Sequence, residues 1–374
     1  MQMYSKKNRL LAYHDTYVNE VLPILSDIEY TRLGILNELR NIVLLIYLSP
    51  LTILAIFMCV QIQEGNPAYF ILLFFLIPVL VILHCYVRYH HNKKFRNMAK
   101  TKILPVLLKS FGGITWIAHD PTKKNLDGVR VENTELDRSG LFISYNTRYT
   151  DDEFKGSYKG IPFKISETKM FDIHGSGKQR RCICAFEGVI LSFKFNKKIN
   201  NRTIVATKWD LTKKSQLLMT MLMWILPISI GVLQGGYAHW KLVLSIMILV
   251  GGFFIVNSFE KKEEALDKVL LEDPKFDKRF DVYSSDQVEA RYLVTPSFME
   301  RFYNLKTAFG AKKIKCSFYD DTFMVAISTS KNLFEVCSLF KSLRDPSYMQ
   351  EFYKELDSVY KMIDHFKLYE KTGL

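Results

Sequence analysis

Two long uncharged runs near the N-terminus constrain this chain more than any other feature. Residues 41–63 (NIVLLIYLSPLTILAIFMCVQIQ) and 68–87 (AYFILLFFLIPVLVILHCYV) contain no Asp, Glu, Lys or Arg. Each run is long enough for the roughly 20 residues that an α-helix needs to cross a hydrocarbon core. The runs therefore predict a transmembrane hairpin over residues 41–88.

A second pair of apolar runs lies in the middle of the chain, at residues 216–233 and 242–256. It predicts a second transmembrane hairpin over residues 216–257, with a short final span. Basic residues flank both hairpins, and the positive-inside rule places such flanks, and with them both termini, in the cytoplasm. The chain has 51 Lys and Arg against 38 Asp and Glu. This topology accounts for the excess of positive charge, so no nucleic-acid partner is expected.

The segments outside the apolar runs have two different periodicities. Residues 1–40 repeat apolar positions at helical spacing and predict an amphipathic cytoplasmic helix. Residues 89–215 and 258–374 contain short alternating runs between turn residues, which is typical of antiparallel strands, and the second segment ends in a predicted helix. The predicted fold is therefore a membrane α-helical protein with two hairpins and a discontinuous cytoplasmic α+β domain, formed by these two segments around an antiparallel sheet.

Two turns are predicted within that sheet. Glu187 and Gly188 stand between two apolar runs and predict a tight turn from one strand to the next. Residues 312–328 predict a β-hairpin, with Asp320 and Asp321 near its turn.

Three segments carry a family resemblance: RSGLFISYNTRYTDDEFKGSYKGIPFKISE, FEGVILSFKFNKKINNRTIVA and LEDPKFDKRFDVYSSDQVEARYLVTPSFMERF. In this order they resemble the signature blocks of the bacterial domain of unknown function 3137 (DUF3137), over residues 90 to 335. The resemblance implies a multi-pass protein of the bacterial cytoplasmic (inner) membrane, without an assigned activity or accepted catalytic residues. It also implies a membrane-protein partner, because genes of the family are often found near those of LemA-like membrane proteins.

Three consecutive acids, Asp151, Asp152 and Glu153, are candidate ligands for Mg²⁺ or Ca²⁺, which prefer several oxygen ligands. The acids lack the alternating spacing and the turn glycine of a calcium loop, and a solvated turn or strand start is the favoured interpretation. No catalytic, cofactor-binding or metal-binding residue is therefore assigned, and no cofactor is expected.

Basic residues offer candidate contacts for phosphate or lipid head groups, on charge alone. They fall in two groups, one at a Gly/Ser-rich hairpin tip and one after the first apolar hairpin: Lys178, Arg180 and Arg181, and Lys93, Lys94 and Arg96. Beside the first group, Cys182 and Cys184 share one face of a predicted strand. Core or half-buried packing is expected for both cysteines.

The sequence leaves two function classes open. The favoured one is a non-enzymatic, membrane-tethered module that binds a protein or lipid and assembles with it. The alternative is a membrane-bound enzyme that acts on a phosphate-bearing or lipid substrate, with Lys178, Arg180 and Arg181 as ligands, for which the sequence provides no nucleophile, base or metal set. The expected partners are membrane lipids, a second copy of the chain, or a LemA-like protein.

Overall fold

The computed structural model describes residues 6–61, 68–118, 135–142, 145–175, 180–208, 266–308 and 311–366. The second predicted hairpin, residues 216–257, lies outside these residues. The chain divides into two compact units, residues 1–118 with 332–360 and residues 119–331 with 361–374. We call them the helical unit and the sheet unit.

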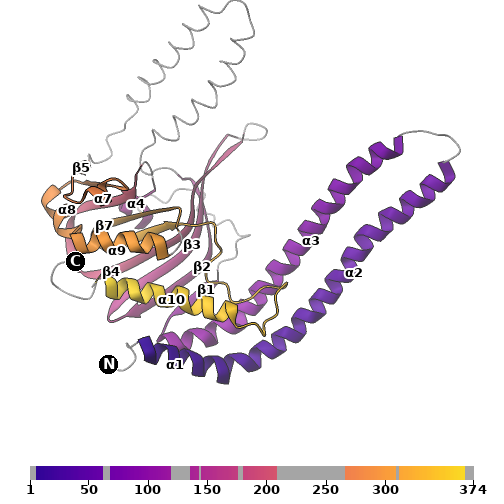
Figure 1. Cartoon of the computed structure of the whole chain (residues 1–374), viewed down its shortest axis with the longest axis horizontal. Helices are drawn as coiled ribbons and strands as arrows, with labels where there is room; N and C mark the ends of the chain where they lie inside the picture. Colours follow the sequence, from indigo (N-terminus) through magenta and orange to yellow (C-terminus); the bar gives the residue numbers. More distant parts are fainter. Residues whose placement is uncertain are drawn as a thin grey trace, which may run out of the picture. The chain divides into compact units, whose positions relative to one another are not determined.

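The helical unit contains two long helices that run side by side, α2 and α3 (Figure 1). It begins with α1 (Lys6–Thr16) and a π-helical turn, η2 (Tyr17–Val21), which lead into α2 (Leu22–Gln61). Helix α3 (Ala68–Leu107) is followed by a 3₁₀ turn, η4 (Leu108–Phe111), and by the short strand β1 (Thr115–Ala118). Gly112 adopts φ 74° at the end of η4, a left-handed conformation that glycine tolerates best.

No helix in the described part of the chain combines the length and the apolarity that crossing a bilayer requires. The predicted membrane fold, with its multi-pass topology and its inner-membrane localisation, is therefore wrong. The two N-terminal runs are segments of longer helices that also contain charged residues. Helix α2 starts at Leu22 and includes charged Asp27 and Arg32, and α3 continues through Arg88 to Leu107. Apolarity alone does not reveal whether a helix is covered by lipid or by protein.

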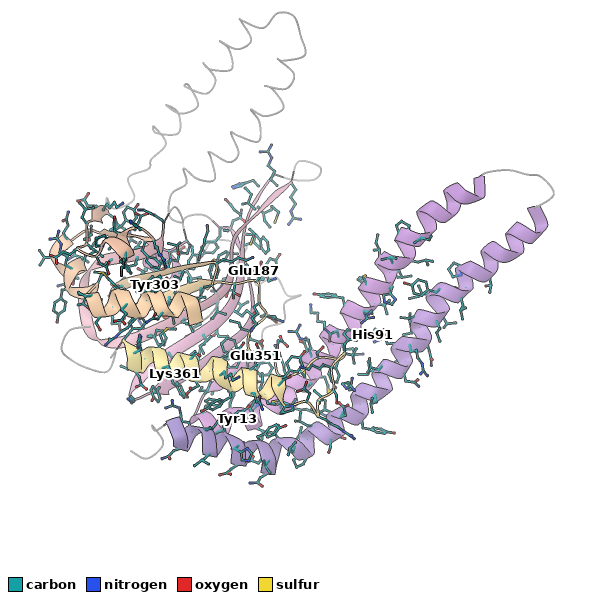
Figure 2. The ribbon with its side chains drawn as sticks, viewed as in Figure 1. Tyr13, His91, Glu187, Tyr303, Glu351 and Lys361 are labelled. Carbon is teal, nitrogen blue, oxygen red and sulfur yellow. The ribbon has the colours of Figure 1, made fainter. Side chains whose placement is uncertain are left out.

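The ends of the helical unit are joined by contacts between α1 and helix α10 (Ser347–His365), residues of which fall in both units. Tyr13, labelled in Figure 2, donates a hydrogen bond to the Met349 carbonyl at 2.6 Å. Its ring packs on Tyr353 and Phe111, with centroids 4.8 and 5.7 Å away. Since all three rings are buried or half-buried against one another, they hold the N-terminal helix to the C-terminal segment.

A segment of irregular structure, residues 332–346, which we call the strap, is held to the long helices by polar contacts. Glu335 receives hydrogen bonds from Arg96 and from Lys100, the latter at 3.0 Å. Asn92 on α3 accepts a hydrogen bond from the Leu339 amide at 3.0 Å. The backbone groups of a buried loop must find partners, and side chains of the long helices supply them here.

The sheet unit contains the antiparallel sheet that the alternating runs predicted. Its strands are β2 (Thr147–Tyr158), β3 (Ile161–His174), β4 (Arg181–Thr207), β5 (Asp267–Val269), β6 (Phe280–Ser284) and β7 (Lys313–Ser328). Neighbouring strands follow the order β2-β3-β4-β6-β5, and β7 also pairs with β4. The helices of this unit are α4 (Glu135–Ser139), α7 (Pro274–Asp277), α8 (Gln287–Leu293) and α9 (Pro296–Ala308).

The predicted turn at Glu187 and Gly188 is wrong, because both residues lie inside β4, a strand of 27 residues. Gly188 pairs with Ser328 of β7, and the Glu187 carbonyl accepts a hydrogen bond from Thr329 at 3.1 Å. A Cβ at Gly188 would lie 2.0 Å from the Ile327 carbonyl oxygen. The glycine is needed for this close approach of two strands and not for a turn.

The predicted hairpin over residues 312–328 is also wrong. Strand β7 runs without reversal from Lys313 to Ser328, and both of its halves pair with β4. Asp320 adopts φ 51° where the register shifts. Asp tolerates this left-handed conformation better than most residues, so the Asp-Asp pair that resembled a turn forms an irregularity in a continuous strand.

Phenylalanine rings fill the core between α9 and β7. Phe298 of α9 lies 5.4 Å from Phe318 and 5.2 Å from Phe366 between ring centroids, and Phe318 stacks on Phe323 at 4.6 Å. All four rings are fully buried. Such a cluster is a large part of the apolar area that the sheet unit removes from water.

Two aspartates begin short helices in the segment 271–302, the block most specific to the family resemblance. Asp273 accepts hydrogen bonds from the amides of Lys275 and Phe276, and Pro274 occupies the first helical position. Asp286 in the same way accepts from Val288 at 2.7 Å. These caps satisfy amides that have no partner within the helix, so the local sequence determines where α7 and α8 start.

Candidate functional site

A bulge in β2 gathers three carboxylates. The register between β2 and β3 shifts between Thr150 and Glu153, and Asp151 and Asp152 lie in this shift. A bulge re-aims the side chains that it carries. One ligand oxygen from each of Asp151, Asp152 and Glu167 lies within 4.8 Å of the others. The structure thus brings together two of the three predicted acids and adds Glu167 from β3.

Glu153 is not part of this acid cluster. It forms ion pairs with Lys155 at 3.0 Å and with Lys164 at 3.2 Å. Burial raises the pKa of Glu153, but the hydrogen bonds and charges of the two lysines outweigh burial and lower that pKa overall. Glu153 is therefore a partner of the basic residues on β2 and β3.

The acid cluster has the donor type that Mg²⁺ and Ca²⁺ prefer. Asp152 is only 2% exposed, so the predicted solvated turn does not describe it. Sequence reasoning missed Glu167 because only the register of β2 on β3 places it opposite the bulge. Clusters of acids also occur without an ion, and we assign no metal to this one.

The predicted anion or lipid contacts do not form one site. Lys178 lies outside the described residues. Arg180 and Arg181 are exposed at the start of β4, in the sheet unit, while Lys93, Lys94 and Arg96 lie on α3 in the helical unit. Arg96 is engaged by Glu335 of the strap. Of the five described residues, Lys94, Arg180 and Arg181 are exposed, and Lys93 and Arg96 are half-buried.

The cysteines of β4 are exposed, so the expected core or half-buried packing of Cys182 and Cys184 is wrong. Partial desolvation of its thiol by neighbouring residues and, second, the nearby Glu187 carboxylate raise the pKa of Cys184. A raised pKa disfavours the thiolate, which is the nucleophilic form. Cys184 therefore lacks the electrostatic activation of a catalytic thiol.

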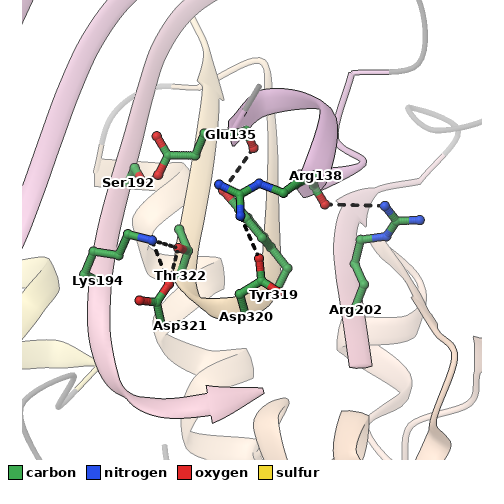
Figure 3. A network of polar contacts seen from close by, with 9 residues as sticks. All are labelled: Glu135, Arg138, Ser192, Lys194, Arg202, Tyr319, Asp320, Asp321 and Thr322. Atoms are coloured by element: carbon green, nitrogen blue, oxygen red, sulfur yellow. Dashed lines mark hydrogen bonds and ion pairs between the residues drawn. The ribbon is translucent and has the colours of Figure 1, made fainter. Parts of the chain in front are cut away.

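A polar network attaches α4 to the sheet, as Figure 3 shows. Ser192 donates to the Glu135 carboxylate at 2.9 Å, and the Tyr319 hydroxyl donates to the Glu135 carbonyl at 3.0 Å. Burial raises the pKa of Tyr319, which keeps this hydroxyl a donor. Arg138 and Asp320 add an exposed ion pair of 3.1 Å, of a kind that contributes at most about 1 kcal/mol.

Lys194 of β4 joins this network through contacts with β7. It donates to Asp321 at 2.6 Å and to Thr322 at 2.8 Å. The hydrogen bond from Lys194 lowers the pKa of Asp321. Arg138 and Lys194 are each paired with an aspartate. This is the arrangement of a structural contact between α4, β4 and β7.

Helix α3 exposes large apolar side chains on the face opposite its contact with α2. Four of them, which we call the docking stripe, are between 58% and 67% exposed: Val79, Ile82, Tyr86 and Tyr89. Their spacing of three, four and three residues keeps them within an arc of roughly 80° on a helix. Leu80, buried, and His91, labelled in Figure 2, lie on the other side of α3.

Comparisons with known proteins give one family and one distant structure. No curated protein matches the chain. The crystal structure of the mycobacterial trehalose monomycolate transport factor A, TtfA, is similar over 70% of this chain and 91% of that chain. Its identity of 10% and its TM-score of 0.31 are too low to support any argument.

The family comparison confirms the resemblance that the signature blocks suggested. Residues 184–368 match the family described as Protein of unknown function (DUF3137). The match contains the second and third of the three signature blocks, and it extends beyond them toward the C-terminus. This segment, just under half of the chain, is therefore similar to the DUF3137 family, whose function is unknown.

Proposed function

We propose that the protein is a non-catalytic interaction module, and that the docking stripe on α3 binds an amphipathic helix of a partner protein. The observation that carries the proposal is the spacing of the four exposed side chains. Positions three and four residues apart form the seam along which two helices pack. A partner helix with the same spacing would cover all four side chains at once.

The composition of the docking stripe supports a protein partner. Tyr86 and Tyr89 combine a large apolar ring with a hydroxyl that can hydrogen-bond, and tyrosine is enriched at the centres of protein interfaces. Contiguous apolar surface of this kind is rare on a side of a protein that stays in water. Leu83, a further exposed apolar residue of α3, adjoins the stripe beside Val79.

The basic residues at the C-terminal end of the docking stripe indicate the charge of the partner. Lys93 follows Tyr89 by four residues and continues the same face, and Lys94 beside it is exposed. Charged residues along such a seam select partners of opposite charge. We therefore expect acidic residues on the partner helix where it passes Lys93 and Lys94.

Site-specific photocrosslinking in cells tests this proposal. A photoreactive residue replaces Tyr86, and a matched control carries it at Lys354, which is exposed on α10. The Tyr86 probe is expected to capture one protein, at partner residues three or four positions apart in a helix. Val79→Glu in the same chain should reduce the captured amount about tenfold or more, because a charge enters an apolar contact. The experiment also determines whether the partner is the LemA-like protein that the resemblance implies.

Three results would overturn the proposal. They are capture no stronger than at Lys354, capture of lipid instead of protein, and capture that Val79→Glu leaves unchanged. The alternative function, an enzyme for phosphate-bearing or lipid substrates, has no supporting geometry in the part of the chain that the structure describes.

A further inference from the structure

Strands β3 and β4 extend beyond their neighbours and form a two-stranded projection in the sheet unit (Figure 1). The pairing of β2 with β3 reaches only Phe171, and the pairing of β7 with β4 begins only at Gly188. We call residues 171–174 and 181–186 the β arm. Each strand of the arm thus has one edge that no described strand covers.

Asn146 covers the edge of the arm that belongs to β3. Its backbone amide donates to the Phe171 carbonyl at 3.0 Å. Its side chain accepts from the Ile173 amide at 2.9 Å and donates to the Ile173 carbonyl at 2.6 Å. The side-chain amide therefore makes the two hydrogen bonds that a further strand residue would make, and it ends the sheet on this side.

The hydrogen bonds of Asn146 also show which backbone groups of β4 point away from β3. The backbone amides and carbonyls of Phe171 and Ile173 point away from β4. Because this direction alternates along a strand, the amides and carbonyls of Asp172 and His174 point toward β4. Asp172 is opposite Ile183, and His174 is opposite Arg181. Arg181 and Ile183 consequently bond to β3, and the amides and carbonyls of Cys182 and Cys184 point to the open edge.

Glu187 confirms this alternation at the point where the open edge ends. Its carbonyl accepts a hydrogen bond from Thr329, on the β7 side of β4. One extra residue, Ala185, enters β4 where the register shifts, between Cys184 and Phe186. Residues 181–186 therefore continue the line along which β7 pairs with β4, and no described strand occupies it.

The side chains around this edge differ between the two faces of the arm. Cys182 and Cys184 share a face with their cross-strand partners Ile173 and Phe171, and that face is apolar. Tyr149 extends it, with its ring 5.8 Å from that of Phe171.

The opposite face of the arm carries exposed Arg181 and Ile183. Asp172 on this face is paired with His174 at 3.0 Å and lies one strand farther from the edge. Neither Arg181 nor its neighbour Arg180 forms an ion pair with a described residue. The positive charge at the edge is thus available to a strand that pairs with β4.

We infer that the edge of β4 at residues 181–186 accepts an extended segment of a partner protein whose side chains alternate between apolar and acidic. Backbone hydrogen bonds to Cys182 and Cys184 would supply the pairing, as in other cases of strand addition. Apolar side chains of the segment would lie beside the cysteines, and acidic ones beside Arg181. This surface is separate from the docking stripe, so either proposal can fail without the other.

A peptide-binding experiment on the full chain tests the inference. The probe is a fluorescently labelled hexapeptide of alternating valine and glutamate, and its comparison peptide alternates valine and lysine. Fluorescence anisotropy should show binding of the glutamate peptide, with at least tenfold weaker binding of the lysine peptide. Ile82→Glu, which disrupts the docking stripe, should leave this binding unchanged.

Proline variants separate strand pairing from simple charge attraction. Cys184→Pro removes an outward amide and leaves the bonds of β4 to β3 intact, because those come from neighbouring residues. It should abolish peptide binding, while Cys184→Ala, which keeps the amide, should bind as the unmodified protein does. Thermal unfolding of both variants shows whether the sheet unit stays folded. Should the proline variant unfold, Arg181→Glu takes its place, and it should reverse the preference between the two peptides.

Binding of both peptides alike, binding of neither, or glutamate-peptide binding that survives Cys184→Pro in a folded protein would overturn the inference. Sedimentation of the unmodified protein tests whether a second copy of the chain occupies the edge of β4 instead. A dimer that Cys184→Pro dissociates would show that a second copy of the chain takes this place, and the inference would fall.

Discussion

The Arg9 guanidinium donates a hydrogen bond to the Asp357 carboxylate at 2.8 Å, and both side chains are buried. The two residues lie at opposite ends of the sequence and belong to the same helical unit. Arg9 also lies over the Tyr360 ring, 5.3 Å from its centroid. The ion pair thus joins α1 to α10, and its geometry makes the stability of the helical unit depend on both ends of the chain.

Replacement of Asp357 by Ala should destabilise the helical unit strongly. The variant leaves the Arg9 charge buried beside an apolar side chain, a situation that costs about 3 to 5 kcal/mol. Chemical denaturation followed by circular dichroism measures the loss. The double variant Arg9→Met with Asp357→Leu should lose less than Asp357→Ala alone, since no charge is then left buried. Equal losses in the two proteins would contradict this account.

Acid should weaken the attachment of the strap to α2 through Glu29. Its carboxylate accepts hydrogen bonds from Arg32 at 2.8 Å and from the Leu343 amide at 3.0 Å. The Arg32 hydrogen bond is the main cause that lowers the pKa of Glu29 to about 2, against the opposing effect of burial. Because the folded-state pKa lies below the unfolded value, this stabilisation is complete above about pH 4.5 and is lost as the pH falls toward 2.

The matching experiment compares Glu29→Gln with the unmodified protein across that pH range. A shift of this size corresponds to about 3 kcal/mol at neutral pH. The variant should therefore be less stable at pH 7, and the difference from the unmodified protein should shrink steadily toward pH 2. A difference that stays constant with pH would mean that Glu29 acts by packing alone.

Gly188→Ala should disrupt the pairing of β4 with β7. The new methyl group would collide with the Ile327 carbonyl, which is backbone and not the movable end of a flexible side chain. A loss of about 3 kcal/mol or more in the free energy of unfolding is expected, as for other severe backbone conflicts. Gly160→Ala is the matched control, since Gly160 has φ +79° and no atom within 4 Å of the added Cβ. That control should lose about 1 to 2 kcal/mol through conformational strain only.

Asn146→Ala should open the second edge of the β arm. The variant loses both side-chain hydrogen bonds to Ile173 and leaves a strand edge uncovered, which favours association between sheets. Analytical ultracentrifugation should show concentration-dependent self-association that the unmodified protein lacks. Asn146→Asp retains the acceptor for the Ile173 amide and should associate less than Asn146→Ala. Identical sedimentation of all three proteins would contradict the role given to Asn146.

The local features of the fold were readable from the sequence. Alternating side chains predict the strands of the antiparallel sheet, because one face of each strand packs on a core. Asp273 with Pro274 begins α7 through hydrogen bonds that span only three residues. The signature blocks, too, are properties of the sequence alone, and two of them lie in the matched region.

Only the tertiary structure decided which residues far apart in the sequence pair or come into contact. Glycine and aspartate are typical turn residues, but the roles of Gly188 and Asp320 follow from the pairing of β4 with β7. Glu167 joins Asp151 and Asp152 because of a bulge whose place depends on the strand register. Hydropathy predicts membrane spans in the apolar runs of α2 and α3, because it measures the aversion of a segment to water and not the surface that covers it. Local hydrogen bonding and periodicity act over a few residues, whereas register, burial and the partner of an apolar face depend on contacts between segments far apart in the chain.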